Sequence, residues 1–385
     1  MLFTVCGCQQ KSDENSAATG GQPQASSAVS SEVSVKQPAS VRVMAAGDNL
    51  IHSSIYKQAK QSDGSYNFDY AYSHIEDVIK LADLPILNQE TVIAPIYEPS
   101  DYPCFNSPPE LGQKMIDLGF KAFNHSNNHI LDKGESGVKS LLKYWANKRK
   151  KYDIVNTGIY KNEKDLNTVK TLTVGGIKFS FIGITQHTNG LSLPENSNLR
   201  LIYTDEEDVI KDQIQRAKAE SDVVVMNAHW GTEDSHVVTD DQRRLAKKMV
   251  KWGVDIIIGT HPHVLQEIEM LNKPDGTKAP VIYSLGNFIS AQSDTDNMIG
   301  GIADMTVTKD FASGKVTVSG LKMMPVITHY DSGFSNIRNY PYSEYSSSLA
   351  SSHGVRNYHS EFSYDYITRL SKNILGKKYF AKELH

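Results

Sequence analysis

Two histidines close the stretch "DIIIGTHPHV", which spans residues 255–264. The apolar run before them predicts a short buried strand, so His261 and His263 are expected at the mouth of a sheet. Neutral imidazole is the side chain that most often binds metal in proteins. Pro262 is expected to hold the backbone extended, so the two imidazoles should point to opposite sides and each take a different ion.

Potential ligands also follow five other predicted strands. Each alone has an ordinary explanation: a single aspartate there is usually a helix cap or turn former, a single histidine a hydrogen-bonded polar group, and an asparagine the start of an Asx turn. Six loops would need six unrelated explanations, whereas loops at the carboxyl ends of strands normally converge on a ligand. The residues are Asp48 and His52; Asn88 and Glu90; Asn127, Asn128, His129 and Asp132; His229; and Asn287.

This mixture of side chains favours particular metals. Imidazole nitrogen with carboxylate oxygen suits manganese, zinc or iron, while calcium favours oxygen alone and structural zinc favours thiolates. A carboxylate can bridge two such ions about 3.5–4 Å apart, and the pair can clamp a phosphoryl group and activate water near neutral pH. We therefore predict two divalent metal ions, with Glu90 or Asp48 as the bridge.

Alternating strands and helices are predicted to position these residues. Gly175 and Gly176 separate two alternating apolar runs and predict a hairpin, and four late strands are expected to pair antiparallel. The pattern predicts an α/β fold of layered mixed β-sheets flanked by helices. Strands are expected at 41–48, 83–88, 120–126, 152–156, 222–230 and 254–261, helices at 70–82, 108–119, 135–148, 205–220 and 239–253, and the late strands at 263–271, 279–287, 300–310 and 315–327.

The start of the chain predicts a membrane anchor. "MLFTVCGC" resembles the end of a lipoprotein signal, so residues 1–8 are expected to be its remnant, with Cys8 lipidated on the outer face of a bacterial membrane. Residues 9–40 are rich in Ser, Gln and Ala and predict a disordered tether. The alternative is a disordered start on a cytosolic protein. Residues 41–327 form the predicted domain and 328–385 a Tyr- and Ser-rich extension.

Composition excludes two classes of protein. The sequence contains no stretch of 18 or more apolar residues, so no transmembrane helix is predicted. The formal net charge of -4 gives no basic field of the kind that nucleic-acid binding needs.

Six motifs in order resemble the CapA (PgsA) family of poly-γ-glutamate capsule biosynthesis proteins over residues 41–326. They are "AAGDNLIH", "NQET", "NHSNNHILDKGESGV", "AHWGTE", "GTHPHVLQ" and "YSLGNFI". The resemblance implies a calcineurin-like metallophosphoesterase fold. The sequence departs from the usual metallophosphoesterase pattern, because Asn-x-Glu stands where GDxxD is usual and the first histidine follows Asp48 by four residues.

The resemblance also implies roles for individual residues. Asp48, with His52 and His263, would hold one ion; Asn128, His229 and His261 would hold the other; and Glu90 would lie between them. His129 would be the general acid that protonates a leaving oxygen. Asn88, Asp132 and Asn287 would orient ligands instead of binding metal.

Three functions are compatible with these residues. The first is a surface-anchored protein that makes, exports or anchors poly-γ-glutamate or a similar anionic polymer, with membrane capsule synthase subunits as partners. The second is an extracellular metal-dependent phosphoesterase that acts on a phosphate mono- or diester. The third is a scaffold that binds polymer without catalysis.

Overall fold

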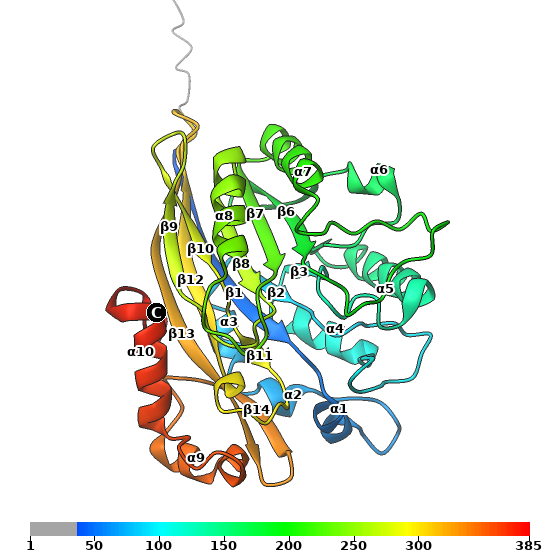
Figure 1. Cartoon of the computed structure of the whole chain (residues 1–385), viewed down its shortest axis with the longest axis vertical. Coiled ribbons are helices and arrows are strands. Elements are labelled where there is room, and N and C mark those ends of the chain that lie inside the picture. The colour runs from blue at the N-terminus through cyan, green and yellow to red at the C-terminus, as the bar shows by residue number, and fades with distance from the viewer. Residues whose placement is uncertain (1–36) are drawn as a thin grey trace, which may run out of the picture. The chain divides into compact units, whose positions relative to one another are not determined.

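Two mixed β-sheets form the centre of the protein. The structure is a computed structural model that describes residues 37–385. One sheet has eight strands in the order β14-β13-β12-β1-β2-β3-β4, with β11 beside β1; the other has six in the order β5-β6-β7-β8-β10-β9 (Figure 1). Their bounds are β1 Ala39–Asn49, β2 Leu84–Asn88, β3 Ala122–Asn124, β4 Val155–Thr157, β5 Lys170–Val174, β6 Ile177–Thr185, β7 Val223–His229, β8 Ile256–Thr260, β9 Ile268–Asn272, β10 Lys278–Ile282, β11 Asn287–Ile289, β12 Ile299–Lys309, β13 Val316–Asp331 and β14 Ser335–Pro341.

The six-stranded sheet is apolar on both faces. Along β7, Val223 and Val225 belong to a core shared with the eight-stranded sheet, whereas Val224 and Met226 belong to a second core beneath two helices. This alternation follows from the two-residue period of a strand. Residues of α7 (Glu207–Glu220) and α8 (Asp240–Trp252) complete the second core. The sheet is therefore held between another sheet and a helical layer.

Other helices connect the strands β1 to β4 of the eight-stranded sheet. The predicted helix over 70–82 is in fact two single turns, α2 (Asp69–Tyr72) and α3 (Glu76–Ile79). α8 begins with a capping box, in which Thr239 and Gln242 satisfy each other's backbone N–H groups. The others are α1 Ser53–Ala59, α4 Pro109–Asp117, α5 Gly134–Arg149 and α6 Glu163–Leu166.

The predicted α/β fold of layered mixed sheets is confirmed, and late strands pair antiparallel as expected in β9–β10 and β12–β13. The hairpin around Gly175 pairs β5 and β6 antiparallel as expected. The segment 279–287, however, supplies β10, which is parallel to β8, and begins β11, which is parallel to β1. Both parallel pairings direct the chain toward the edge where the other strands end. That edge is where the candidate ligands lie.

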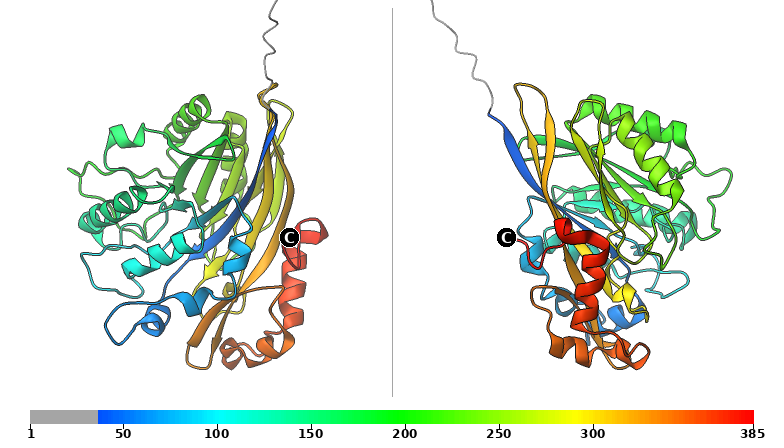
Figure 2. Two further views of the ribbon diagram at one scale, coloured as in Figure 1. Left: turned by 180° about the vertical axis from the view of Figure 1, so that it is seen from behind. Right: turned by 60° about the vertical axis from the view of Figure 1, so that its left-hand side comes forward.

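The C-terminal residues belong to the same compact unit as the sheets. β13 runs across the expected boundary after residue 327, and β14 pairs with β13. α9 (Ser347–Ser352) and α10 (Tyr364–Tyr379) follow, and α10 runs alongside β13 in both views of Figure 2. Phe362 and Ile367 are fully buried in the main core.

Two expectations about the membrane concern different parts of the chain. Among the described residues, every helix is too short or too polar to cross a membrane. The lipobox with Cys8 lies outside the described residues, as does the tether up to residue 36. Its expected end at residue 40 is wrong, because Ala39 and Ser40 already belong to β1 and pair with β12.

Two isoleucines of α10 test whether this helix is part of the core. Ile367 is 0% exposed and Ile374 is only partly buried. We expect Ile367→Ala to lower the free energy of unfolding by about 2–5 kcal/mol, because the substitution removes buried methyl groups and leaves a cavity. Ile374→Ala is the matched control and should cost clearly less. Equal small losses in chemical denaturation would show that α10 is dispensable for stability.

Candidate metal centre

Strand register aligns the candidate ligands in two rows. In the eight-stranded sheet, Asp48 lies opposite Asn88 of β2 and Asn287 of β11. In the six-stranded sheet, His229 lies opposite Thr260 of β8. These positions are at the carboxyl ends of parallel strands, where ligand sites of α/β sheets form.

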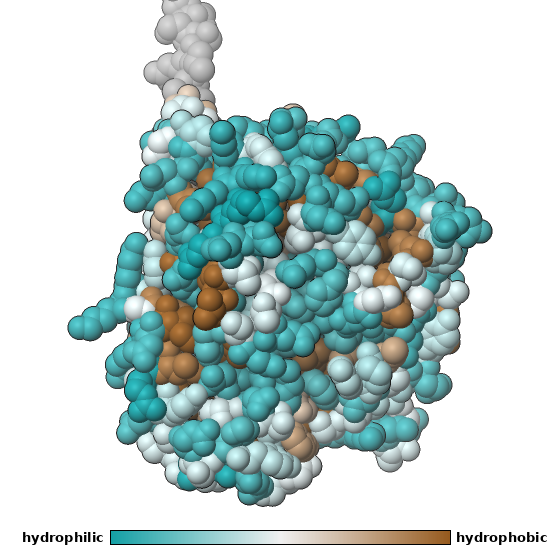
Figure 3. All heavy atoms as spheres, in the orientation of Figure 1, coloured by the Kyte–Doolittle hydropathy of each residue, from teal (hydrophilic) through white to brown (hydrophobic). Residues whose placement is uncertain are grey.

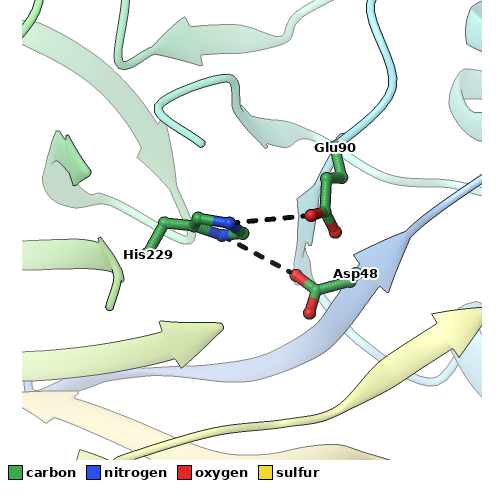
Figure 4. Close-up of side chains that lie close together, drawn as sticks. All are labelled: Asp48, Glu90 and His229. Atoms are coloured by element: carbon green, nitrogen blue, oxygen red, sulfur yellow. Dashed lines mark ion pairs between the residues drawn. The ribbon is translucent and has the colours of Figure 1, made fainter. Parts of the chain in front are cut away.

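Asp48, Glu90 and His229 form a buried group that could hold a metal ion. Each side chain offers one ligand atom, and these atoms all lie within 4.8 Å of one another. Figure 4 shows the ring of His229 with one nitrogen toward each carboxylate. Nδ1 is 3.9 Å from Asp48 Oδ1, and Nε2 is 3.6 Å from Glu90 Oε1.

Three more side chains extend this group. His229 Nε2 lies 3.0 Å from Asn128 Oδ1 and 3.2 Å from His261 Nδ1. His263 Nδ1 is 3.3 Å from Asp48 Oδ2, and its Nε2 is 3.8 Å from Glu90 Oε1. One cluster therefore holds Asn128, His229 and His261, the other holds Asp48 and His263, and Glu90 faces both.

The loop after β8 differs from the sequence expectation. His261 and His263 were predicted on an extended backbone pointing apart, but their φ angles are +99° and +59°. This left-handed conformation costs a non-glycine residue free energy, and such strain is found at functional sites. The loop is held by the His261 N–H, which donates to Asp48 Oδ2 at 3.2 Å, and by the Asp234 N–H, which donates to the Pro262 carbonyl at 2.9 Å. Both imidazoles consequently face one centre, with ring centroids 6.1 Å apart.

Neighbouring polar groups orient the ligands. Asn88 Nδ2 donates to Asp48 Oδ1 at 2.7 Å, and Asn287 Oδ1 lies 3.0 Å from His263 Nδ1. Thr260 Oγ1 lies 3.0 Å from His229 Nδ1. A proton on Nδ1 of each histidine would satisfy these contacts and leave Nε2 for a metal. The sequence analysis missed Thr260, whose only signal was its place directly before "HPH".

His129 is positioned by Asp132 and by an aromatic ring. Its Nδ1 lies 2.8 Å from Asp132 Oδ2, and its ring meets Phe105 edge to face at 4.8 Å. Asp132 Oδ2 also accepts the Phe105 backbone N–H at 2.7 Å. Asn127, by contrast, forms the Asx turn that is its ordinary explanation, since its Oδ1 accepts the His129 N–H at 3.1 Å.

His52 lies beside the clusters instead of joining their close contacts. Its Nδ1 accepts the Ala291 N–H at 3.1 Å, and its ring packs edge to face on Phe105 at 5.2 Å. Burial lowers its pKa to about 4, against the opposing charge of Asp101. His52 is therefore neutral at physiological pH, with Nδ1 occupied by a backbone donor.

The loop after β6 adds two residues that sequence reasoning missed. The His187 ring meets the His261 ring edge to face at 4.9 Å. Asn189 Oδ1 accepts from Asn128 Nδ2 at 3.3 Å, so it orients the amide whose oxygen faces His229. Both follow a strand end, as the other candidates do, but the segment was interpreted only as a hairpin.

The electrostatics of the centre fit a cation. Both oxygens of Glu90 are buried without a hydrogen-bond partner, which is costly for a charged group. Burial, with the charge of Asp48, raises the pKa of Glu90 well above its ordinary value. Burial alone would lower the pKa of His263. The nearby carboxylates of Glu90 and Asp48 have a larger opposite effect and raise this pKa to about 10. A metal ion beside Glu90 would balance the same negative charge.

The other two imidazoles are in the form that binds metal. Burial, with the neighbouring histidines, lowers the pKa of His261 to about 2 and that of His229 well below its ordinary value. Both are therefore neutral near pH 7, as a metal ligand must be. The fold and these donors define an α/β protein with a candidate metal centre at the edge shared by two sheets.

Comparison with known families assigns the chain to one of them. The family described as "Bacterial capsule synthesis protein PGA_cap" matches residues 42–292, and the chain belongs to this family. The expected resemblance to CapA proteins is thereby confirmed.

The chain is 30% identical over 250 residues to "Capsule biosynthesis protein CapA" of Bacillus anthracis, covering 62% of this chain and 58% of that one. It is 30% identical over 252 residues to "PGA biosynthesis protein CapA" of Bacillus subtilis (strain 168), covering 65% and 63%. It thus spans about three fifths of the length of these relatives.

Solved structures of similar shape include two described as phosphatases or nucleotidases. A candidate 5′-nucleotidase from Staphylococcus aureus has a TM-score of 0.45 and 16% identity, over 74% of this chain and 54% of that one. A phosphatase from Mycoplasma pneumoniae has a TM-score of 0.44 and 13% identity, over 75% and 94%.

Glu90→Gln tests the centre directly. The substitution keeps the shape of the side chain but removes the charge that faces both clusters, so metal content should fall by at least about tenfold. Elemental analysis of protein purified without chelator measures this. Glu98→Gln, at an exposed position, is the matched control and should retain the metal content of the unmodified protein. Equal metal in both variants would exclude Glu90 as a ligand.

Proposed function

We propose that this protein acts in the biosynthesis, export or anchoring of a capsule polymer, poly-γ-glutamate or a similar polyanion, and uses a dinuclear metal centre for hydrolysis. Family membership supports the polymer, since the B. anthracis and B. subtilis relatives are named for capsule and PGA biosynthesis. The buried, unpartnered carboxylate of Glu90 between two clusters of ligand atoms is the observation that supports the metal centre.

The donor set gives each residue a role in this proposal. Asn128, His229 and His261 would hold one ion, Asp48 and His263 the other, and Glu90 would bridge them. Two divalent ions of manganese, zinc or iron would polarise the bond to be broken and lower the pKa of water. His129 would deliver a proton from Nε2 to the leaving group, because Asp132 accepts from its Nδ1 and fixes the tautomer.

The site of action is part of the proposal. Cys8 would carry the lipid, and the residues between Cys8 and β1 would act as a tether, so the folded unit would work at the extracellular face of the membrane beside capsule synthase subunits. The lipobox-like "VCGC" followed by a polar, Ser-rich segment supports this placement.

Complementation in an encapsulated strain tests the function. Deleting the gene should abolish the polyanionic capsule, and the unmodified gene should restore it. Glu90→Gln should restore less than about a tenth, since hydrolysis would require the metal centre. Glu98→Gln is the matched control and should restore the full amount. Full restoration by Glu90→Gln would instead support a scaffold that binds polymer without catalysis.

A metal-dependent phosphoesterase is the second candidate, favoured by the mixture of imidazole, carboxylate and amide donors around Glu90. The protein should then hydrolyse an aryl phosphate with added manganese, and His263→Ala should reduce kcat/KM by at least about a hundredfold. His74→Ala, at a histidine paired with Glu344 at 2.9 Å, should leave the rate unchanged.

A second substitution separates the proposed general acid from the metal ligands. His129→Gln should slow an alkyl phosphate by about 10²–10⁴-fold and an aryl phosphate far less, because an aryl oxide leaves without a proton. If the protein hydrolyses neither the alkyl nor the aryl phosphate with manganese, zinc or iron, the phosphoesterase candidate is excluded.

A further inference from the structure

A second polar site lies on the flank of the molecule, between α5, β4 and β5. A cavity of about 250 Å³ is lined there by Arg149, Lys161 and Lys170 against a single carboxylate, Asp165. Trp145 forms part of its apolar wall. The cavity is distinct from the metal centre, since none of the proposed metal ligands lines it.

Two of the three cations that line this cavity form no ion pair among the described residues. Lys170 Nζ pairs with Asp165 Oδ1 at 2.5 Å, which uses the only carboxylate. Arg149 Nη1 donates to the neutral Asn156 Oδ1 at 2.9 Å. Within residues 37–385, the side chains of Arg149 and Lys161 form no ion pair. Two positive charges therefore face the cavity in a chain whose formal net charge is -4.

An open hollow of about 500 Å³ continues the site along α5. It shares Leu142 and Lys161 with the cavity. Its lysines at 139, 143 and 150 follow the spacing of one helix stripe, in which residues three, four or seven apart lie on one side. Of these, only Lys139 forms an ion pair, with Glu135 at 3.1 Å, among the described residues.

The lining of the hollow favours an aliphatic polyanion. Apart from the lysines its walls include Leu142, Ala146 and Leu199, and no aromatic side chain. Single-stranded nucleic acid is bound by exposed aromatic rings on which bases stack. Figure 3 shows that the face in the orientation of Figure 1 is mainly hydrophilic, with separate hydrophobic areas. An Arg guanidinium at the mouth of a cavity suits bidentate contact with a carboxylate.

We propose that the cavity and the hollow form one binding site for a flexible chain of repeated carboxylates. The cavity takes one carboxylate at Arg149 and Lys161, and the lysine stripe of α5 takes its neighbours along the chain. The inference rests on the proposed function, which supplies a polymer of this chemistry. It adds the place where that polymer binds.

The new site is connected to the metal centre by a short segment. Asn156 contacts both sides of this segment. Its Oδ1 accepts a hydrogen bond from Arg149, and its Nδ2 lies 3.0 Å from His125 Nε2. Burial, with the charge of Arg149, lowers the pKa of His125 to about 3, so its neutral ring can accept that bond. His125 precedes Asn128 by three residues in the loop after β3. A polymer bound along α5 would therefore lie on the flank of the loop that carries Asn128 and His129.

Binding of a labelled γ-linked decaglutamate to the full chain tests this site. By fluorescence anisotropy at low ionic strength, the double variant Arg149→Gln/Lys161→Gln should raise Kd about tenfold or more, while metal content stays unchanged. Lys247→Gln/Lys251→Gln removes the same charge from exposed positions of α8 and should change Kd less than about twofold. Thermal melts should be alike, because the substituted side chains are exposed.

Three results would overturn the inference: no binding to the unmodified protein, equal weakening by the α8 control, or equally tight binding of a single-stranded DNA of the same charge. Tight binding of an uncharged γ-linked chain would also contradict it.

The proposed function can fail separately. A capsule unaffected by gene deletion, with binding that still depends on Arg149 and Lys161, would leave the site and remove the function. If the capsule depends on Glu90 but the protein does not bind decaglutamate, the proposed function stands and the α5 site is excluded.

Discussion

The unbalanced negative charge of two buried carboxylates is the constraint on which the rest of this structure depends. Asp48 and Glu90 are 0% and 1% exposed, and Glu90 has no hydrogen-bond partner for either oxygen. Such a pair is tolerated inside a protein only with a cation or a shared proton nearby. Those charges raise the pKa of His263 to about 10, so a proton on its ring would compensate them. A metal ion would take over the same compensation.

This constraint explains the polar architecture of the sheet edge. Asn88, Asn128 and Asn287 lie at this edge, and each contacts a charged or ligating side chain. Asn88 links Asp48 to Asn124, since its Nδ2 donates to Asp48 and its Oδ1 accepts from Asn124 at 2.9 Å. Amides can donate and accept without adding charge, so they fix the carboxylate without neutralising it. The strained loop at His261 and His263 is held in part by a backbone hydrogen bond to Asp48.

The candidate metal centre and the proposed polymer site lie in different parts of the fold. The metal centre lies where both sheets end, and its donors are buried to within a few per cent exposure. The α5 flank instead presents exposed cations on a helix stripe. A polymer that is both held and cleaved needs both: a dry site for the bond and a wet surface for the chain. The loop after β3 contributes to each.

The sequence by itself determined the strand ends and the residue types found there. Apolar runs ending in Asp48, Asn88, His229 and His261 predicted strands that the structure contains, because buried strands need continuous apolar side chains. Motif order also gave the family. The sequence did not predict which strand ends lie next to one another, because this depends on the tertiary structure. The parallel directions of β10 and β11, the left-handed loop that turns both imidazoles inward, and the contributions of Thr260, His187 and Asn189 all depend on contacts between residues distant in the chain. Local spacing carries no information about such contacts.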